Sequence, residues 1–249
     1  ARTKAVFIES IGNPLGNVTD IRALADVAHA HGVPLIVDNT VPSPYLLRPI
    51  EHGADIVVHS LTKYLGGHGN SVGGAVVDSG KFPWAEHKAR FKRLNEPDVS
   101  YHGVVYTEAL GPAAYIGRVR VVPLRNTGAA ISPHNAFLIL QGIETLALRM
   151  DRICENTQKI AETLQKHPKI EWVRYAGLQD HPDHALVKKQ LGGRASGILS
   201  FSLKNGSGDS DTRAAGARFL DALQLFTRLV NIGDAKSLAT HPASTTHRQ

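Results

Sequence analysis

The 249-residue sequence contains a single cysteine, Cys154. Because a disulfide needs two cysteines, no internal disulfide can form. The sequence also lacks an apolar run near the roughly 18 residues that a membrane-spanning helix requires. Its N-terminus has no charged segment followed by the apolar centre of a secretory signal. We therefore expect a soluble, cytoplasmic protein that makes no contact with membranes.

Aromatic residues are scarce, at 6% of the sequence, while the formal net charge is +6. The basic residues gather most closely between Lys81 and Arg93, where Glu86 interrupts them. No zinc-finger or single-strand-binding pattern accompanies them. We predict no nucleic-acid partner and interpret this stretch as a solvated basic face. A positive field of this kind also suits an anionic cofactor and an anionic substrate.

The glycine motifs of nucleotide-binding proteins are missing as well. Val72 occupies the third glycine position of a GxGxxG pattern counted from Gly67, and Gly80-Lys81 is followed by Phe82 rather than by serine or threonine. The sequence therefore contains neither the dinucleotide-binding motif GxGxxG nor the P-loop motif of mononucleotide-binding proteins.

Thirteen histidines offer candidate metal ligands. The closest pairs, His29 with His31 and His181 with His184, lack the i, i+4 spacing of helical zinc sites, and no second cysteine supports them. We predict no metal site. His59 and His241 are interpreted as structural groups or as groups that support a site.

Strand-like and helix-like patterns alternate along the first part of the chain. The predicted elements are, in order, a strand at 5–8, a helix at 19–32, a strand at 34–37, a short helix at 46–52, and strands at 56–58 and 75–77. Such alternation predicts a parallel sheet with right-handed crossovers. Ligands of these sheets bind outside the carboxyl ends of the strands, where Asn13, Asp38, Ser60 and Lys63 fall.

The second half is predicted to begin with a long helix. Residues 81–130 are irregular, apart from an apolar segment at 118–124 that could pack against the sheet. Ser132-Pro133 then starts a helical pattern that continues for some thirty residues, to Leu164. The remaining residues alternate again between strand and helix patterns. We expect the long helix to bridge to a smaller α/β domain.

Two reactive side chains follow neighbouring predicted strands, Asp38 and Lys63. An aldehyde cofactor needs an amine that holds it as a Schiff base, and its pyridine nitrogen needs a carboxylate that keeps the ring protonated. Ser60 and Thr62 lie two apart, so an extended backbone would aim both hydroxyls the same way, toward a phosphate. Residue types alone also fit a surface lysine and a capping aspartate. The four groups together point to pyridoxal 5'-phosphate (PLP).

Four stretches resemble the Cys/Met-metabolism family of PLP enzymes. They are Ser10-x-x-Asn13-Pro14, Val37-Asp38-Asn39-Thr40, His59-Ser60-x-Thr62-Lys63-Tyr64-x-Gly66-Gly67-His68, and Ser132-Pro133-His134-Asn135 through Arg149-Met150. Their order and spacing hold over nearly the whole chain. The resemblance implies the α/β fold of PLP-dependent transferases, which is aspartate aminotransferase-like (fold type I). Residues 1–148 would form the C-terminal portion of the large PLP-binding domain, and residues 149–249 an incomplete small domain.

The resemblance also implies a role for each candidate residue. Lys63 is expected to carry the cofactor as a Schiff base and Asp38 to pair with the pyridine nitrogen. Ser60 and Thr62 are expected to bind the phosphate. The catalytic residues implied are therefore Lys63 and Asp38.

Two further residues are implied at the substrate. Asn13 is expected near the ring hydroxyl and the substrate carboxylate, and Ser237 is expected to face the substrate. The family's glycine-containing phosphate loop and its ring-stacking tyrosine are expected before Ala1, and its carboxylate-binding arginine after Gln249. A neighbouring subunit is expected to supply a tyrosine and an arginine to the phosphate. The resemblance thus implies a chain truncated at both ends and a homotetramer of tight dimers.

Within the family, residues 231–247 and the insertion at 81–94 are most similar to the O-acetylhomoserine sulfhydrylases. This similarity implies γ-replacement, in which O-acetyl-L-homoserine and sulfide, or methanethiol, give L-homocysteine, or methionine, and acetate. A cystathionine or methionine γ-lyase, or a cystathionine γ-synthase, would share every cofactor residue. A basic binding protein without catalysis is the alternative from another class, and the four intact cofactor residues disfavour it.

Overall fold

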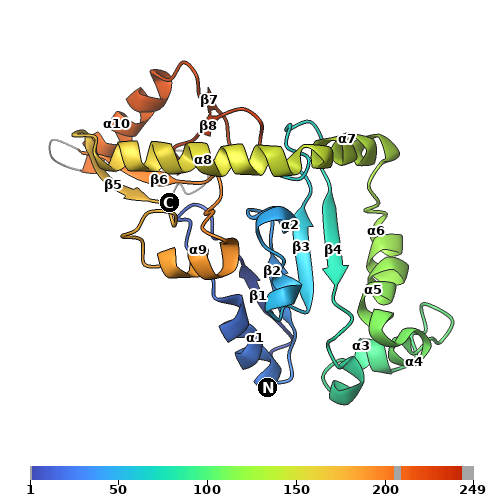
Figure 1. Ribbon diagram of the computed structural model, residues 1–249. Helices are drawn as coiled ribbons and strands as arrows, with labels where there is room; N and C mark the ends of the chain where they lie inside the picture. Colours follow the sequence, from blue (N-terminus) through green and yellow to red (C-terminus); the bar gives the residue numbers. More distant parts are fainter. Residues whose placement is uncertain (1, 205–208, 243–249) are drawn as a thin grey trace.

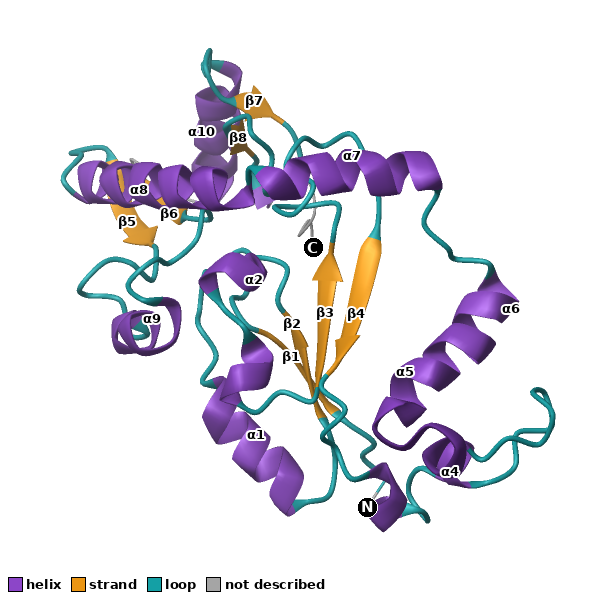
Figure 2. Cartoon of the chain, turned by 45° about the vertical axis from the view of Figure 1, so that its right-hand side comes forward, coloured by secondary structure: helices purple, strands orange, loops and turns teal. Residues whose placement is uncertain are grey.

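The computed structural model describes residues 2–204 and 209–242 (Figure 1). Its central feature is a four-stranded sheet in the order β1-β2-β3-β4, and its smaller features include two two-stranded sheets, β5-β6 and β7-β8. The long helix α8 (Leu146–Gln165) extends to one side beyond the end of the central sheet, and the small sheet β5-β6 lies beside it in both cartoon views (Figures 1 and 2).

The central sheet is mainly parallel, as predicted. The strands β1 (Val6–Glu9), β2 (Leu35–Asp38) and β3 (Ile56–Ser60) run in parallel, and β4 (Gly74–Asp78) pairs antiparallel with β3. The β-branched residues of these strands favour a pleated, buried surface. Parallel pairing brings the carboxyl ends of β1, β2 and β3 to one edge of the sheet.

The first crossover helix, α1 (Ile21–Ala30), begins and ends where the sequence indicates. The Asp20 side chain caps it by accepting from the backbone N–H of Ala23 at 3.1 Å. Gly32 follows the helix with φ = +63°, a backbone conformation that glycine adopts without strain. The helix buries Ile21, Ala25 and Ala28 in the main hydrophobic core.

The short helix predicted at 46–52 is wrong in extent. The structure has a helix α2 (Ser43–Leu46) and a separate 3₁₀ turn η1 (Pro49–His52). Leu47 between them is extended, with φ = −148° and ψ = 133°. Pro49 explains the break, because a residue that precedes proline is pushed out of the helical region, and Arg48 has φ = −116° and ψ = 90°.

The irregular segment at 81–130 folds into short helical pieces. In chain order they are η2 (Trp84–His87), α3 (Lys92–Asn95), α4 (Tyr106–Leu110), η3 (Gly111–Ala113), α5 (Ala114–Val119), η4 (Arg120–Leu124) and α6 (Arg125–Thr127). They surround a second hydrophobic cluster that includes Ile56 of β3. Val121 and Val122 pack against this cluster, so the predicted apolar segment does reach the sheet.

The long helical pattern forms two consecutive helices, α7 (Pro133–Glu144) and α8 (Leu146–Gln165), which meet at Thr145. Ser132 caps α7 by accepting from the backbone N–H of Asn135 at 3.2 Å, as its position before Pro133 predicts. Figure 2 shows α7 across the carboxyl end of β3.

The remaining elements confirm the predicted α/β alternation. They are β5 (Ile170–Arg174), α9 (His184–Leu191), β6 (Ser200–Leu203), α10 (Asp209–Asp221), β7 (Thr227–Arg228) and β8 (Leu238–Ala239). Helix α9 was not predicted. A single hydrophobic cluster contains Ile21 and Leu35 together with Met150 and Leu191. The proposed boundary between residues 148 and 149 stays a prediction.

Candidate active site

Thr40 holds the carboxyl ends of β2 and β3 together. Its backbone N–H donates to Oδ1 of Asp38 at 2.9 Å, and its hydroxyl accepts from the backbone N–H of Ser60 at 2.8 Å. Asp38 is half-buried. Among the described residues, its second carboxylate oxygen has no hydrogen-bond partner. One carboxylate oxygen of Asp38 is thus available to a hydrogen-bond donor from outside the described residues.

The residue after Asp38 is a buried anchor. The amide of Asn39 is fully shielded from solvent and donates to the carbonyls of Ser43 at 3.2 Å and Leu47 at 2.8 Å. Its Oδ1 accepts from the hydroxyl of Ser10 at 2.9 Å. Because these bonds join the ends of β1 and β2 to α2, they fix the backbone from which Asp38 projects.

Lys63 lies on the turn that follows β3 and is half-buried. Its amine donates to Oδ1 of Asn231 at 2.6 Å. Gly233, two residues further on, has φ = +74°, and a Cβ atom there would overlap the backbone nitrogen of Tyr64. Ala235 donates its backbone N–H to Gly67 at 2.8 Å. The segment 231–235, which sequence reasoning did not connect with Lys63, therefore packs directly on the lysine turn.

Arg149 of α8 braces the same turn from the other side. Its guanidinium donates to the carbonyls of Tyr64 at 2.8 Å, Leu65 at 3.4 Å and Gly142 at 2.6 Å. Burial lowers the pKa of Arg149. A Cβ atom on Gly67 would overlap this guanidinium, so the turn and the arginine are in close contact. Arg149 was noted in a sequence motif, but no role in positioning the lysine turn was predicted for it.

The expected alignment of Ser60 and Thr62 is wrong. Ser60 ends β3, and residues 61–66 form a turn, so the two hydroxyls do not alternate along an extended strand. Hydrogen bonds from Lys63 N–H to Ser60 and from Gly67 N–H to Lys63 wind this segment. The Thr62 hydroxyl donates to the carbonyl of Gly73 at 3.3 Å and accepts its N–H at 3.2 Å. The Ser60 hydroxyl has no partner among the described residues.

Asn13 and Ser237 are both exposed. The backbone N–H of Asn13 donates to the carboxylate of Glu9 at 3.3 Å, and the carbonyl of Ser237 accepts from Thr227 at 2.9 Å. No hydrogen bond joins either of them to Lys63 among the described residues. Residues 243–247 of the similarity segment lie outside the described residues.

His59, on β3, is buried among the strands of the sheet. Burial lowers its pKa, while Asp38 and a backbone hydrogen bond at Asn39 oppose that shift. Its Nδ1 has no hydrogen-bond partner among the described residues. This placement agrees with the expectation of a structural or supporting histidine.

The described ranges contain no group of three or more His, Cys, Asp or Glu side chains placed to hold a metal ion. Among the helices of the same ranges, none combines enough length with enough apolar character to cross a bilayer.

Comparison with known proteins decides the family. The family model described as Cys/Met metabolism PLP-dependent enzyme matches residues 1–249. The chain belongs to this family. Its fold agrees, because a solved structure from Campylobacter jejuni superposes with a TM-score of 0.91 and 42% identity over 99% of this chain and 57% of that one. That protein is provisionally assigned as an O-acetylhomoserine (thiol)-lyase and carries a pyridoxyl-lysine monophosphate residue.

Curated relatives share about half of the residues of the chain. The homocysteine synthase of Schizosaccharomyces pombe is 50% identical over 99% of this chain and 56% of its own length. The O-acetyl-L-homoserine sulfhydrylase of Leptospira meyeri is 51% identical over 100% of this chain and 56% of its own length. The chain therefore spans a little over half the length of these relatives.

Proposed function

We propose that the protein to which this chain belongs is an O-acetylhomoserine sulfhydrylase. It would convert O-acetyl-L-homoserine and sulfide, or methanethiol, to L-homocysteine, or methionine, and acetate. The observation that carries the proposal is the meeting of Lys63 and Asn231 beside the strand end that presents Asp38. The names and identities of the curated relatives support the choice of reaction.

The residues at this edge fit a PLP cofactor. Asp38 has one carboxylate oxygen without a partner among the described residues, Ser60 has an unpartnered hydroxyl, and Lys63 presents a primary amine held by a single neutral acceptor. When bound, PLP supplies an aldehyde that condenses with amines and a protonated ring that accepts electrons. Asp38 would hold the ring nitrogen, Lys63 the aldehyde carbon, and Ser60 and Thr62 the phosphate.

Thr62 is the least free of these groups. Its hydroxyl already donates to the carbonyl of Gly73 and accepts from the N–H of Gly73. A phosphate would therefore compete with Gly73 for this hydroxyl. Ser60 is under no such constraint. We infer that Ser60 contributes more to phosphate binding than Thr62 does.

Lys63 would then act as the mobile base of the reaction. Once free of the cofactor, the Lys63 amine would take the proton from the substrate Cα and then move a proton at Cβ, which would let acetate leave from Cγ. The same amine would return the protons in reverse order after sulfide or a thiol has added at Cγ. Asn231 would receive the amine between these steps, since its Oδ1 accepts from Nζ at 2.6 Å.

Asn13 and Ser237 are proposed substrate contacts. Both are exposed loop residues, and so both can meet a small molecule that enters from solvent. We also propose that the whole protein is a cytoplasmic homotetramer without membrane or nucleic-acid partners. The exposed apolar residues on β1 and β4, such as Phe7, Val76 and Val77, support burial of this sheet against further protein.

The reaction is tested with the chain and all the flanking sequence that its gene encodes. The protein is supplied with O-acetylhomoserine and sulfide, and the products are measured by mass spectrometry. Homocysteine and acetate in equal amounts are expected. Production of 2-oxobutyrate and ammonia would instead identify a γ-lyase. Absence of product with both sulfide and methanethiol would contradict the proposal. Lys63→Ala is the negative control, and size-exclusion chromatography tests the tetramer.

A further inference from the structure

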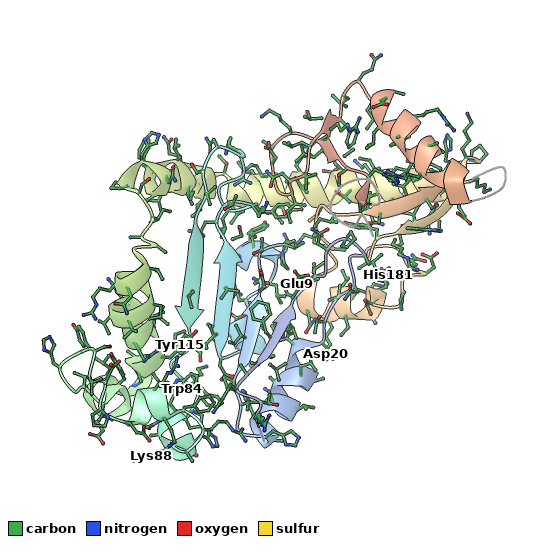
Figure 3. All side chains as sticks on the ribbon, turned by 180° about the vertical axis from the view of Figure 1, so that it is seen from behind. Glu9, Asp20, Trp84, Lys88, Tyr115 and His181 are labelled. Atoms are coloured by element: carbon green, nitrogen blue, oxygen red, sulfur yellow. The ribbon has the colours of Figure 1, made fainter. Side chains whose placement is uncertain are left out.

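A second site lies at the opposite end of the central sheet. A cavity of about 190 Å³ is lined by Ala5 before β1, Pro34 before β2 and Ile56 at the start of β3. These are the amino ends of the parallel strands, whereas Asp38 and Lys63 follow the carboxyl ends. Figure 3 shows Trp84 and Tyr115 at this end of the sheet, away from Glu9 at the end of β1. The cavity is therefore separate from the candidate active site.

Aromatic side chains form the wall of this cavity. The rings of Trp84 and Tyr115 stack with centroids 5.4 Å apart and an interplanar angle of 10°. Phe91 meets Trp84 edge-on at 5.0 Å. Together with Ile36 and Ile56 these rings present a rigid apolar surface. A cavity of about 150 Å³ with apolar walls holds a benzene molecule, so this one accommodates a ring with a short substituent.

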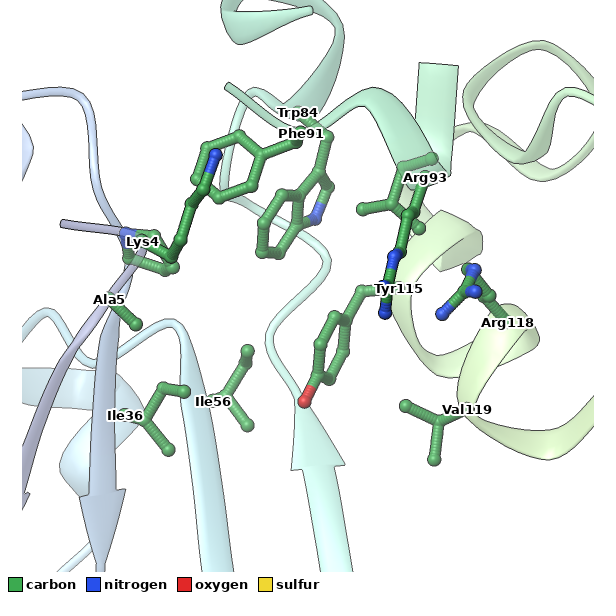
Figure 4. Close-up of a pocket in the computed structure, with 12 residues that line it drawn as sticks. Lys4, Ala5, Ile36, Ile56, Trp84, Phe91, Arg93, Tyr115, Arg118 and Val119 are labelled. Carbon is green, nitrogen blue, oxygen red and sulfur yellow. The ribbon is translucent and has the colours of Figure 1, made fainter. Parts of the chain in front are cut away.

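The charged residues of the lining are all cationic. They are Lys4, Arg93 and Arg118, and no acidic side chain belongs to the lining. Figure 4 places Lys4 on one side of the cavity and Arg93 and Arg118 on the other. Asp98 partly neutralises Arg118 at 3.8 Å, whereas the one hydrogen bond of the Lys4 amine within the described residues goes to a neutral carbonyl, that of Arg90, at 2.6 Å. The net field at the cavity therefore favours an anion.

One nitrogen donor beside the cavity, Nε1 of Trp84, is buried and has no hydrogen-bond partner among the described residues. Nε of Arg118 faces Oδ2 of Asp98 at 3.8 Å. Leaving a buried donor unpaired is unfavourable, and an acceptor from a ligand would satisfy it. Figure 4 shows the indole nitrogen of Trp84 turned to the side where Arg93 and Arg118 lie. A carboxylate there would meet both the positive charge and the indole N–H of Trp84.

We propose that this cavity binds a small monocarboxylate with an apolar, ring-sized body and no cationic group. The ring would lie against Trp84 and Tyr115, and the carboxylate would face Arg93 and Arg118. An amino acid fits poorly, because its ammonium group would meet the three cations. The proposal does not depend on the reaction at Lys63.

Benzoate is the probe, and the fluorescence of Trp84 is the readout. The 249 residues contain two tryptophans, so Trp172→Phe, with any tryptophan of the flanking sequence also replaced by Phe, leaves Trp84 as the reporter. Titration in the full gene-encoded chain is expected to give saturable quenching that weakens as the salt concentration rises. Benzyl alcohol, which has the ring but no charge, and benzylamine, which has the opposite charge, are expected to bind at least tenfold more weakly.

Arg93→Gln and Lys4→Gln should each weaken benzoate binding about fivefold, the effect of losing one partly exposed ion pair. Lys88→Gln is the matched control, because Lys88 is an exposed base near Trp84 that does not line the cavity. Its affinity should stay within twofold. Calorimetry measures the same affinities independently of fluorescence. Absence of saturable binding at millimolar benzoate, equal binding of benzyl alcohol, or no effect of Arg93→Gln and Lys4→Gln would each overturn the proposal.

Discussion

The amine of Lys63 donates to the Oδ1 of Asn231 across 2.6 Å, although 168 positions separate the two residues in the sequence. The contact joins the turn after β3 to the segment between β7 and β8. The lysine is therefore held by a part of the chain that no local pattern associates with it. The predictions for Asn231, Arg149 and Gly233 depend on how this turn is built.

Asn231→Ala should slow turnover while leaving the cofactor bound. Because the variant loses only the acceptor for the lysine amine, the proton transfers at Cα and Cβ should slow about tenfold, with little change in the PLP absorption band. Stopped-flow absorbance with O-acetylhomoserine measures the rate. Asn126→Ala, an exposed asparagine on α6, is the control and should keep the parent rate. An unchanged rate in Asn231→Ala would refute the role of this contact.

Arg149→Met should destabilise the fold by about 3 kcal/mol, because the carbonyls of Tyr64, Leu65 and Gly142 lose a shared charged donor. The free energy of unfolding is measured in urea. Arg152→Met is the matched control three residues further along α8, since Arg152 is exposed and, among the described residues, pairs with Glu155 at 3.6 Å. It should change stability by less than about 0.5 kcal/mol. Equal losses of unfolding free energy in Arg149→Met and Arg152→Met would contradict the stabilising role of the Arg149 hydrogen bonds.

Gly233→Ala and Gly128→Ala separate backbone strain from close packing. Both glycines have positive φ, +74° and +66°, but only a Cβ on Gly233 would overlap the backbone of Tyr64. Gly128→Ala should cost about 1 kcal/mol and keep full activity. Gly233→Ala should cost more and also reduce the rate, because Tyr64 and Lys63 must move. Chemical denaturation and initial rates decide the outcome, and retained activity in Gly233→Ala would count against the packing.

His59 should make the protein less stable in mild acid. Burial lowers its pKa below the usual 6.5, so the unfolded chain binds a proton more readily than the folded one. Stability from this group is present above pH 6.5 and is lost as the pH falls through and below that value. His59→Gln should therefore show a smaller loss of unfolding free energy between pH 7.5 and 5.5. Exposed His102→Gln is the control, and an identical pH slope in parent and His59→Gln would disprove the contribution.

The sequence predicted the edge of the sheet well, for physical reasons. The apolar strand patterns at 34–37 and 56–58 depend on local periodicity, and parallel pairing then brings their carboxyl ends together. The capping of α1 by Asp20 and of α7 by Ser132 is equally local. These features need no knowledge of distant contacts.

Other features depended on contacts that no short pattern contains. The contact of Asn231 with Lys63 and the brace from Arg149 join residues far apart in the chain. The extended path assumed for Thr62 was wrong because hydrogen bonds wind residues 61–66 into a turn. The basic stretch near Arg93 was interpreted as a solvated face, although its aromatic neighbours close a cavity against the sheet.

The most direct test of the central claim is the location of the covalent cofactor link. The protein, expressed with all the sequence its gene encodes, is loaded with PLP, reduced with borohydride, digested and mapped by mass spectrometry. The account predicts a pyridoxyl phosphate group on the peptide that contains Lys63, and its absence from Lys63→Ala. A modification confined to another lysine, or none in a protein that turns over O-acetylhomoserine, would contradict it.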